Sequence, residues 1–223
     1  RPLGEGNCAL YNTYQNDDQS LVPFCDSRPL PRIDRWPGYR GAFADGWTAI
    51  DALKAALEAE FAAGRPTHLV VAMMGWRTTQ EEAIRNFNSL MRATALAAPA
   101  DFRPLFIGIT WVGPWSGRWF DPLLEVAAYG NIADLADVLG LTWVGVLTDE
   151  VLLPLSTRIP VTWITHSFGA RAATTATCIG PAIRRGAGDY ARPEGAIERV
   201  IGFQAAFSLM RFDPKRRYVY EDV

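Results

Sequence analysis

The stretch Pro160-Val-Thr-Trp-Ile-Thr-His-Ser-Phe-Gly-Ala-Arg-Ala-Ala-Thr-Thr175 decides the fold of this chain. Residues 161–164 form a short apolar run with β-branched members, which is typical of a buried strand. After Gly169 the residues become small and favour a helix. Residues 165–169, Thr-His-Ser-Phe-Gly, are therefore expected to form a tight turn that leads from a strand into a helix.

Ser167 stands at the centre of this turn. A sharp strand-to-helix turn, known as a nucleophile elbow, presents a serine hydroxyl at the edge of a sheet and needs small residues two positions either side. Gly169 meets that requirement, whereas Thr165 departs from it. The first N–H groups of the helix would stabilise negative charge that develops beside the hydroxyl. The alternative is a strand–helix connection that happens to contain a serine.

Length and composition exclude several classes of function. At 223 residues the chain can form one α/β domain with a full core. Because 22 basic residues nearly balance 24 acidic ones, no nucleic-acid partner is expected. The Cys and His residues show no metal-site spacing, and we expect neither a metal nor a cofactor. Membrane contact is not expected either, since the most apolar run, 131–155, carries Asp134, Asp137, Asp149 and Glu150.

The cysteines and the first residue bear on location. The chain does not begin with Met and shows no signal-peptide core, so we expect a processed product. Cys8 and Cys25 flank a polar loop, and a disulfide between them would imply an extracytoplasmic protein. Cys178 falls within the helix after the turn and is expected to be a small buried residue.

The order of apolar segments predicts the architecture. Residues 1–46 are rich in Pro, Gly and Asp, which indicates an irregular extension with a small antiparallel edge near 8–13 and 20–25. From residue 67 strands and helices alternate, which predicts a doubly wound, mostly parallel sheet flanked by helices in a single domain, 1–223, with its core in 67–207. The expected helices are 47–63, 78–97 and 131–153 (broken near Gly140 and Gly145), and the expected strands are 67–74, 105–111, 161–164 and 199–207.

Three stretches together resemble the α/β-hydrolase superfamily. They are Val70-Val-Ala-Met-Met-Gly-Trp76, Pro104-Leu-Phe-Ile-Gly-Ile-Thr-Trp111 and Trp163-Ile-Thr-His-Ser-Phe-Gly169. The resemblance covers about 67–207 and is similar to a bacterial branch in which Gly-Trp or Gly-Tyr follows the first of these strands. It implies an α/β-hydrolase-like sheet that lacks its usual last strands.

By this resemblance Ser167 is the nucleophile of a serine hydrolase. The backbone N–H groups of Trp76 and Phe168 would then form the oxyanion hole, the pair of donors that binds the negative oxygen of the intermediate. Met74 stands where the family has a histidine. The first 66 residues resemble no family.

An aromatic loop suggests the substrate. Trp115 and Trp119 follow a strand that we expect beside the strand leading to Ser167, at the sheet edge where open α/β sheets bind ligands. With Gly75 they would line a pocket for an apolar acyl group. We therefore expect an esterase or lipase-like enzyme that acts on a small-molecule or lipid ester. These tryptophans could instead pack the loop onto the body of the protein, and a lipase using 131–153 as an amphipathic lid is a further alternative.

The base that a serine hydrolase requires is missing from the sequence pattern. His166 precedes Ser167 and, by the resemblance, points away from the substrate, whereas His68 begins a strand and lies about 23 Å from the catalytic edge at roughly 3.3 Å per residue. An acid and a histidine should follow the serine, but the late aspartates, Asp213 and Asp222, are followed by no histidine. Three explanations stay open: a second polypeptide or C-terminal segment carries the base, the chain is an inactive binding or scaffold protein on this fold, or an unusual base such as an oriented water serves.

Overall fold

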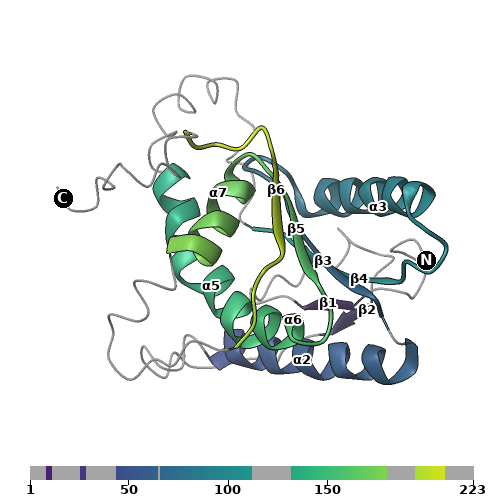
Figure 1. Ribbon diagram of the computed structural model, residues 1–223. Helices are drawn as coiled ribbons and strands as arrows, with labels where there is room; N and C mark the ends of the chain where they lie inside the picture. Colours follow the sequence, from purple (N-terminus) through teal and green to yellow (C-terminus); the bar gives the residue numbers. More distant parts are fainter. Residues whose placement is uncertain are drawn as a thin grey trace.

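The computed structural model describes residues 9–11, 26–28, 44–64, 66–111, 132–179 and 194–208. Its centre is a four-stranded parallel sheet with flanking helices (Figure 1), so the predicted α/β class with a mostly parallel sheet is confirmed. The strand order is β4-β3-β5-β6. The strands are β3 (His68–Met73), β4 (Pro104–Ile109), β5 (Val161–His166) and β6 (Arg199–Phe203).

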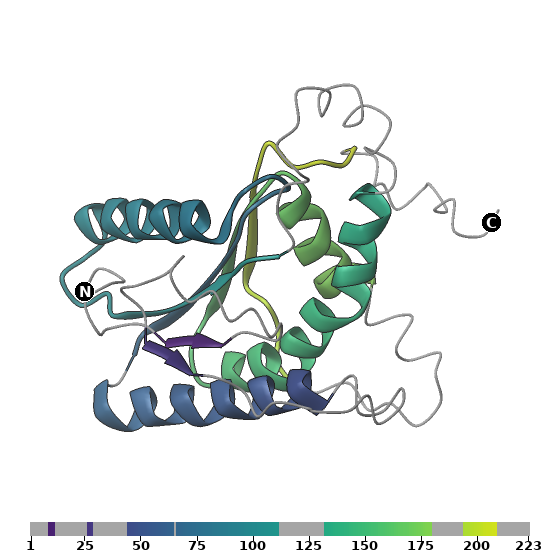
Figure 2. The same ribbon diagram turned by 180° about the vertical axis from the view of Figure 1, so that it is seen from behind.

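Helices cover both faces of the sheet (Figures 1 and 2). On one face α3 (Gln80–Ala97) places Phe87 in a small cluster with Ala72 of β3. The main core lies on the other face, where Leu69, Val71 and Met73 of β3 pack against helices. Because successive strand side chains point to opposite faces, β3 is buried on both sides, as its continuous apolar run indicates. The helices of the main core include α2 (Ala44–Gly64), α5 (Trp143–Leu147), α6 (Leu153–Ser156), α7 (Phe168–Thr174) and the helix over 132–141.

The strand order reverses between β3 and β5. The chain passes from β3 outward to β4, then returns to the other side of β3 and continues through β5 to β6. Open α/β sheets bind ligands at such a reversal, outside the carboxyl ends of the strands. The turns that follow β3 and β5 therefore flank the expected ligand position.

The aromatic loop does not follow a neighbour of β5. β4 pairs with β3 only, and β3 lies between β4 and β5, so the expectation that these two strands are adjacent is wrong. The error arises because the pattern of apolar residues in a strand indicates that the strand is buried but does not indicate which strands pair with it. Trp115 and Trp119 lie outside the described residues, as do Cys8 and Cys25.

Residues 132–156 form a longer helical segment than predicted. It consists of a helix over 132–141, a turn at Thr142, then α5, the π-helix η2 (Thr148–Leu152) and α6. The predicted break near Gly140 falls two residues later, at Thr142, whereas Gly145 lies inside α5 and breaks nothing. A Cβ at Gly140 would lie 2.5 Å from the carbonyl oxygen of Ala172, so glycine serves here to let α7 approach.

The same segment is long and apolar enough to cross a membrane by length and composition alone, contrary to the expectation from its acidic residues. Its mean hydropathy is 1.5 over the most apolar window, and 56% of that window is buried inside the protein. A buried core helix passes the same test. Residues of this segment such as Ile132, Ala136 and Leu147 belong to the main core, and this burial favours a core segment over the lid that is the alternative for 131–153.

Two ion pairs join α2 to the end of this helical segment. Lys54 Nζ lies 2.8 Å from Glu150 Oε2, and Arg158 Nη1 lies 2.6 Å from Glu58 Oε1. Both pairs are partly or largely exposed to solvent. Each is therefore worth at most about 1 kcal/mol.

Further expectations are corrected near the ends of the described ranges. β1 (Ala9–Tyr11) and β2 (Asp26–Arg28) pair in parallel, not antiparallel, and the connection 12–25 is long enough for parallel pairing. Cys178 is exposed on the π-helix η3 (Thr175–Ile179) and not buried. The α-helical period would bury position 178, but the change to π-helical i→i+5 bonding at Thr175 shifts the buried face.

Candidate active site

Ser167 joins β5 to α7 in a backbone conformation that few residues adopt. Its φ is 52° and its ψ is −123°. Such a conformation costs about 1–3 kcal/mol in a residue other than glycine and clusters at functional sites. Hydrogen bonds hold it from both sides: the Ser167 N–H donates to the Phe203 carbonyl at 3.0 Å, and the Ser167 carbonyl accepts from the N–H groups of Ala170 (3.1 Å) and Ala206 (3.2 Å).

The Ser167 hydroxyl has no structural role in the described part of the chain. Ser167 occupies the N-cap position of α7, where a serine side chain usually accepts a hydrogen bond from a first-turn N–H group. It makes no such bond, and its Oγ has no other hydrogen-bond partner among the described residues. The side chain is only half-buried. Helix capping therefore does not account for a serine at this position.

Gly75 lies directly against Ser167. A Cβ built on Gly75 would lie 2.7 Å from Ser167 Cβ and 3.2 Å from Ser167 Oγ, closer than real side chains approach. Only glycine lets the turn after β3 come this near. The fold thus brings Gly75 and Trp76 beside Ser167 and Phe168. The rings of Trp76 and Phe168 meet edge to face with centroids 6.5 Å apart.

The residues two positions either side of Ser167, Thr165 and Gly169, are explained by the atoms that surround them. A Cβ on Gly169 would lie 2.6 Å from the carbonyl oxygens of Met73 and Met74, so α7 can pack on β3 only with glycine there. Thr165 is 1% exposed, and its hydroxyl donates to the Ile201 carbonyl of β6 at 3.1 Å. Gly202 pairs with Thr165 across the sheet. A Cβ there would lie 3.8 Å from Thr165 Oγ1, an ordinary contact, so it is the hydrogen bond to β6 that accommodates the threonine in place of the usual glycine.

Trp111 is a positioning residue that sequence patterns do not identify. Its indole N–H donates to the Met74 carbonyl at 2.8 Å, which fixes the peptide immediately before Gly75. In the sequence, the only indication of this role is that Trp111 is an aromatic residue just after the end of β4. Its role depends on β4 pairing with β3, which the sequence does not reveal.

Neither histidine contacts Ser167 through any interaction of the described residues. His166 Nε2 lies 3.1 Å from Gln204 Oε1, beyond the end of β6. His68 lies at the opposite end of the sheet, where its Nδ1 is 3.0 Å from Thr67 Oγ1 and its ring packs against Phe102. Asp213 and Asp222 lie outside the described residues. Within the described residues, neither histidine side chain is therefore placed to act on the Ser167 hydroxyl.

The described residues contain no group of three or more His, Cys, Asp or Glu side chains that could hold a metal ion. A scan against models of protein families found no match for this chain, and searches of curated proteins and of solved structures found none either. The geometry at Ser167 is thus the basis on which a function can be argued.

Proposed function

We propose that this chain is a serine hydrolase with an α/β-hydrolase-like fold, which cleaves a carboxylic ester through an acyl-enzyme on Ser167. The observation that carries the proposal is the Ser167 hydroxyl, which makes no hydrogen bond to the described residues and belongs to a partly buried residue held at φ 52° at the carboxyl end of β5. The close approach of Gly75 supports it, because a second N–H donor must lie near the nucleophile. The parallel sheet with helices on both faces is compatible with a doubly wound hydrolase architecture.

In the proposed reaction Ser167 Oγ attacks the ester carbonyl carbon and its proton passes to a base. The N–H groups of Trp76 and Phe168 stabilise the negative oxygen of the tetrahedral intermediate, and one such donor is worth about 3–4 kcal/mol of the barrier. The intermediate collapses, the carbon–oxygen bond to the alcohol breaks, and the alcohol leaves with the proton. Water then hydrolyses the acyl-enzyme, which releases the acid and restores Ser167.

The base is assigned to a polypeptide other than this chain. His166 is engaged with Gln204, and His68 lies at the far end of the sheet. A nucleophile and oxyanion hole without a base retain only a small part of the catalysis of a complete triad. The chain alone is therefore expected to react slowly.

The substrate is proposed to be a small-molecule or lipid ester with an apolar acyl group. Trp76 follows Gly75 and packs edge to face on Phe168, and it is proposed to form an aromatic wall of the pocket. Gly75 contributes by bringing the turn after β3 against Ser167, and Trp115 and Trp119 are proposed to extend the pocket. Aromatic surface of this kind gains free energy by covering apolar groups.

One observation favours a second candidate, an inactive binding or scaffold protein on the same fold. It is the lack of a base beside Ser167 among the described residues. Such a protein would keep the elbow geometry for binding alone, because a fold does not determine a function.

The test is labelling by a fluorophosphonate probe, with and without added imidazole as a substitute base. We expect slow labelling of the wild type, faster labelling as imidazole rises, and no labelling of Ser167→Ala. Ser156→Ala is the matched control, because the Ser156 hydroxyl is used in hydrogen bonds with Leu153 and Ala196. A folded wild-type protein that stays unlabelled in both conditions would refute the hydrolase and favour the binding protein.

A further inference from the structure

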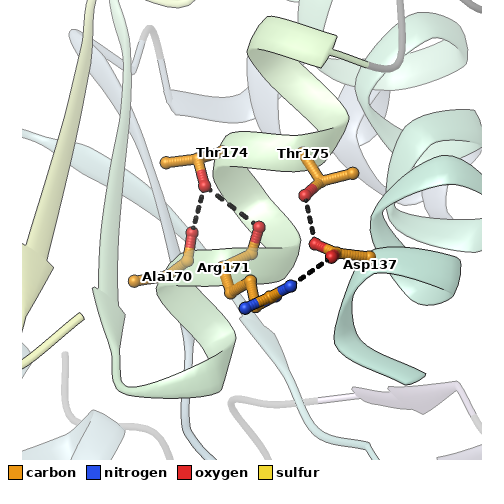
Figure 3. Close-up of polar contacts among 5 residues, drawn as sticks. All are labelled: Asp137, Ala170, Arg171, Thr174 and Thr175. Atoms are coloured by element: carbon orange, nitrogen blue, oxygen red, sulfur yellow. Dashed lines mark hydrogen bonds and ion pairs between the residues drawn. The ribbon is translucent and has the colours of Figure 1, made fainter. Parts of the chain in front are cut away.

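A single buried carboxylate connects the elbow helix to its neighbour. Asp137, in the helix over 132–141, is 5% exposed. Its Oδ2 lies 2.6 Å from Nη2 of Arg171, and its Oδ1 accepts a hydrogen bond of 2.8 Å from the Thr175 hydroxyl (Figure 3). Arg171 and Thr175 are four residues apart, so they lie on one face of the helix. Both oxygens of Asp137 are thus engaged by the same helix.

The two helices are also in close backbone contact beside this carboxylate. A Cβ on Gly140 would lie 2.5 Å from the Ala172 carbonyl oxygen and 2.6 Å from Thr175 Cβ. Gly140 follows Asp137 by one helical turn and faces the same partner. A close contact and a charged pair together fix the position of α7 along its neighbour as well as its distance from it.

We propose that Asp137 is a positioning residue for Ser167. This inference rests on the proposed function, and it assigns to Asp137 the task of holding the helix that immediately follows the nucleophile. Arg171 is the middle residue of α7, four residues after Ser167. Thr175 lies one turn further on, where α7 changes into η3.

The strained backbone of Ser167 explains why such a clamp matters. A residue at φ 52° keeps that conformation only while its surroundings enforce it. On the strand side, Phe203 and Ala206 hold the Ser167 peptide groups. On the helix side, the Ala170 N–H bonds to the Ser167 carbonyl, so a shift of α7 would move Ser167 directly. Asp137 prevents that shift by binding the turn that begins at Arg171.

The experiment measures the labelling of Ser167 by the fluorophosphonate probe in imidazole, separated into a limiting rate constant and an apparent affinity for the probe. Asp137→Asn removes the charge and nearly preserves the shape. We expect its limiting rate constant to fall about 10- to 100-fold, the range for a misplacement of up to about 1 Å, with little change in affinity. For Thr175→Val the limiting rate constant should fall less than for Asp137→Asn. For Thr175→Ser, which keeps the hydroxyl, it should equal that of the wild type.

Glu58→Gln is the matched control. It breaks an ion pair of the same 2.6 Å length, between Glu58 and Arg158, that is far more exposed and does not involve α7. Each variant is measured well below its melting temperature. Asp137→Asn labelling at the wild-type rate, or Glu58→Gln slowing as much, would overturn the inference. If Asp137→Asn does not fold, equal rates for Thr175→Val and Thr175→Ser overturn it. A wild-type protein that never labels refutes the proposed function and this inference together.

Discussion

Gly75→Ala is the sharpest perturbation of the proposed site. The added methyl group would lie 2.7 Å from Ser167 Cβ and 3.2 Å from the His166 carbonyl oxygen. Ordinary contact begins at 3.4 Å, so the turn after β3 or Ser167 must move by at least about 0.7 Å. The φ of Gly75 is not in the left-handed region, and the effect is therefore steric and not conformational.

This displacement predicts a small loss of stability and a large loss of reactivity. Overfilling a packed site costs about 1–3 kcal/mol. For a chain of this size that corresponds to a fall in melting temperature of about 2–12 °C. A nucleophile moved by about 1 Å from its donors loses on the order of 100-fold in rate. The two effects differ enough to be separated by experiment.

The assay compares thermal melting with the rate of fluorophosphonate labelling in imidazole. Gly64→Ala is the control, because a Cβ on Gly64 meets no atom within 4 Å. It should leave the labelling rate unchanged and the melting temperature equal or slightly higher. If folded Gly75→Ala labels as fast as the wild type, Gly75 does not shape the site of Ser167 and the reasoning is refuted.

Other substitutions test neighbouring parts of the argument. Ser167→Gly should abolish labelling yet raise the free energy of unfolding by about 1 kcal/mol, because glycine relieves the positive φ; a loss of stability in a urea titration would contradict this. Thr165→Val should lower the melting temperature by a few degrees, because the Ile201 carbonyl loses a hydrogen bond worth about 1 kcal/mol. An unchanged melting temperature would show that this hydrogen bond does not contribute to stability. Asp137→Asn should lower the free energy of unfolding, measured by urea titration, by about 3 kcal/mol. This is the lower end of the range for a broken buried ion pair, because the Arg171 side chain is 22% exposed. A loss below about 1 kcal/mol would show that the pair contributes no more than an exposed ion pair.

Local sequence signals predicted the elements around the site. The continuous apolar run before Gly75 indicated a strand covered on both faces, and β3 is that strand. The Thr79 hydroxyl accepts a hydrogen bond from the Glu82 N–H at 3.1 Å, as the capping-box pattern predicts at the start of α3. The turn at 165–169 follows from a strand pattern that changes to a helix pattern within a few residues. Each of these signals lies within a single segment.

The features of the candidate site that the sequence did not predict depend on contacts between distant segments. The hydrogen bond from Thr165 to the Ile201 carbonyl could be predicted only if the pairing of β5 with β6 were known. The clamp between Asp137 and Arg171 joins residues 34 positions apart. The acidic residues of 131–155 were evidence against a membrane span, but they did not show that Asp137 would be buried with partners from α7 and η3.

The conformation of Ser167 costs free energy, and within the described part of the chain its side chain makes no hydrogen bond that would offset this cost. This favours a function for Ser167. The positive φ of Ser167 costs free energy that glycine would avoid. Its hydroxyl makes no hydrogen bond to the described residues, so the serine recovers nothing by capping α7. Gly75 and Gly169 bring the turn after β3 and the helix onto this one residue, where larger side chains would fill the space. Natural proteins depart from locally stable choices mainly at functional sites. A serine held at a sheet edge in this way is accounted for by chemistry or binding at its hydroxyl, and the imidazole experiment distinguishes between the two.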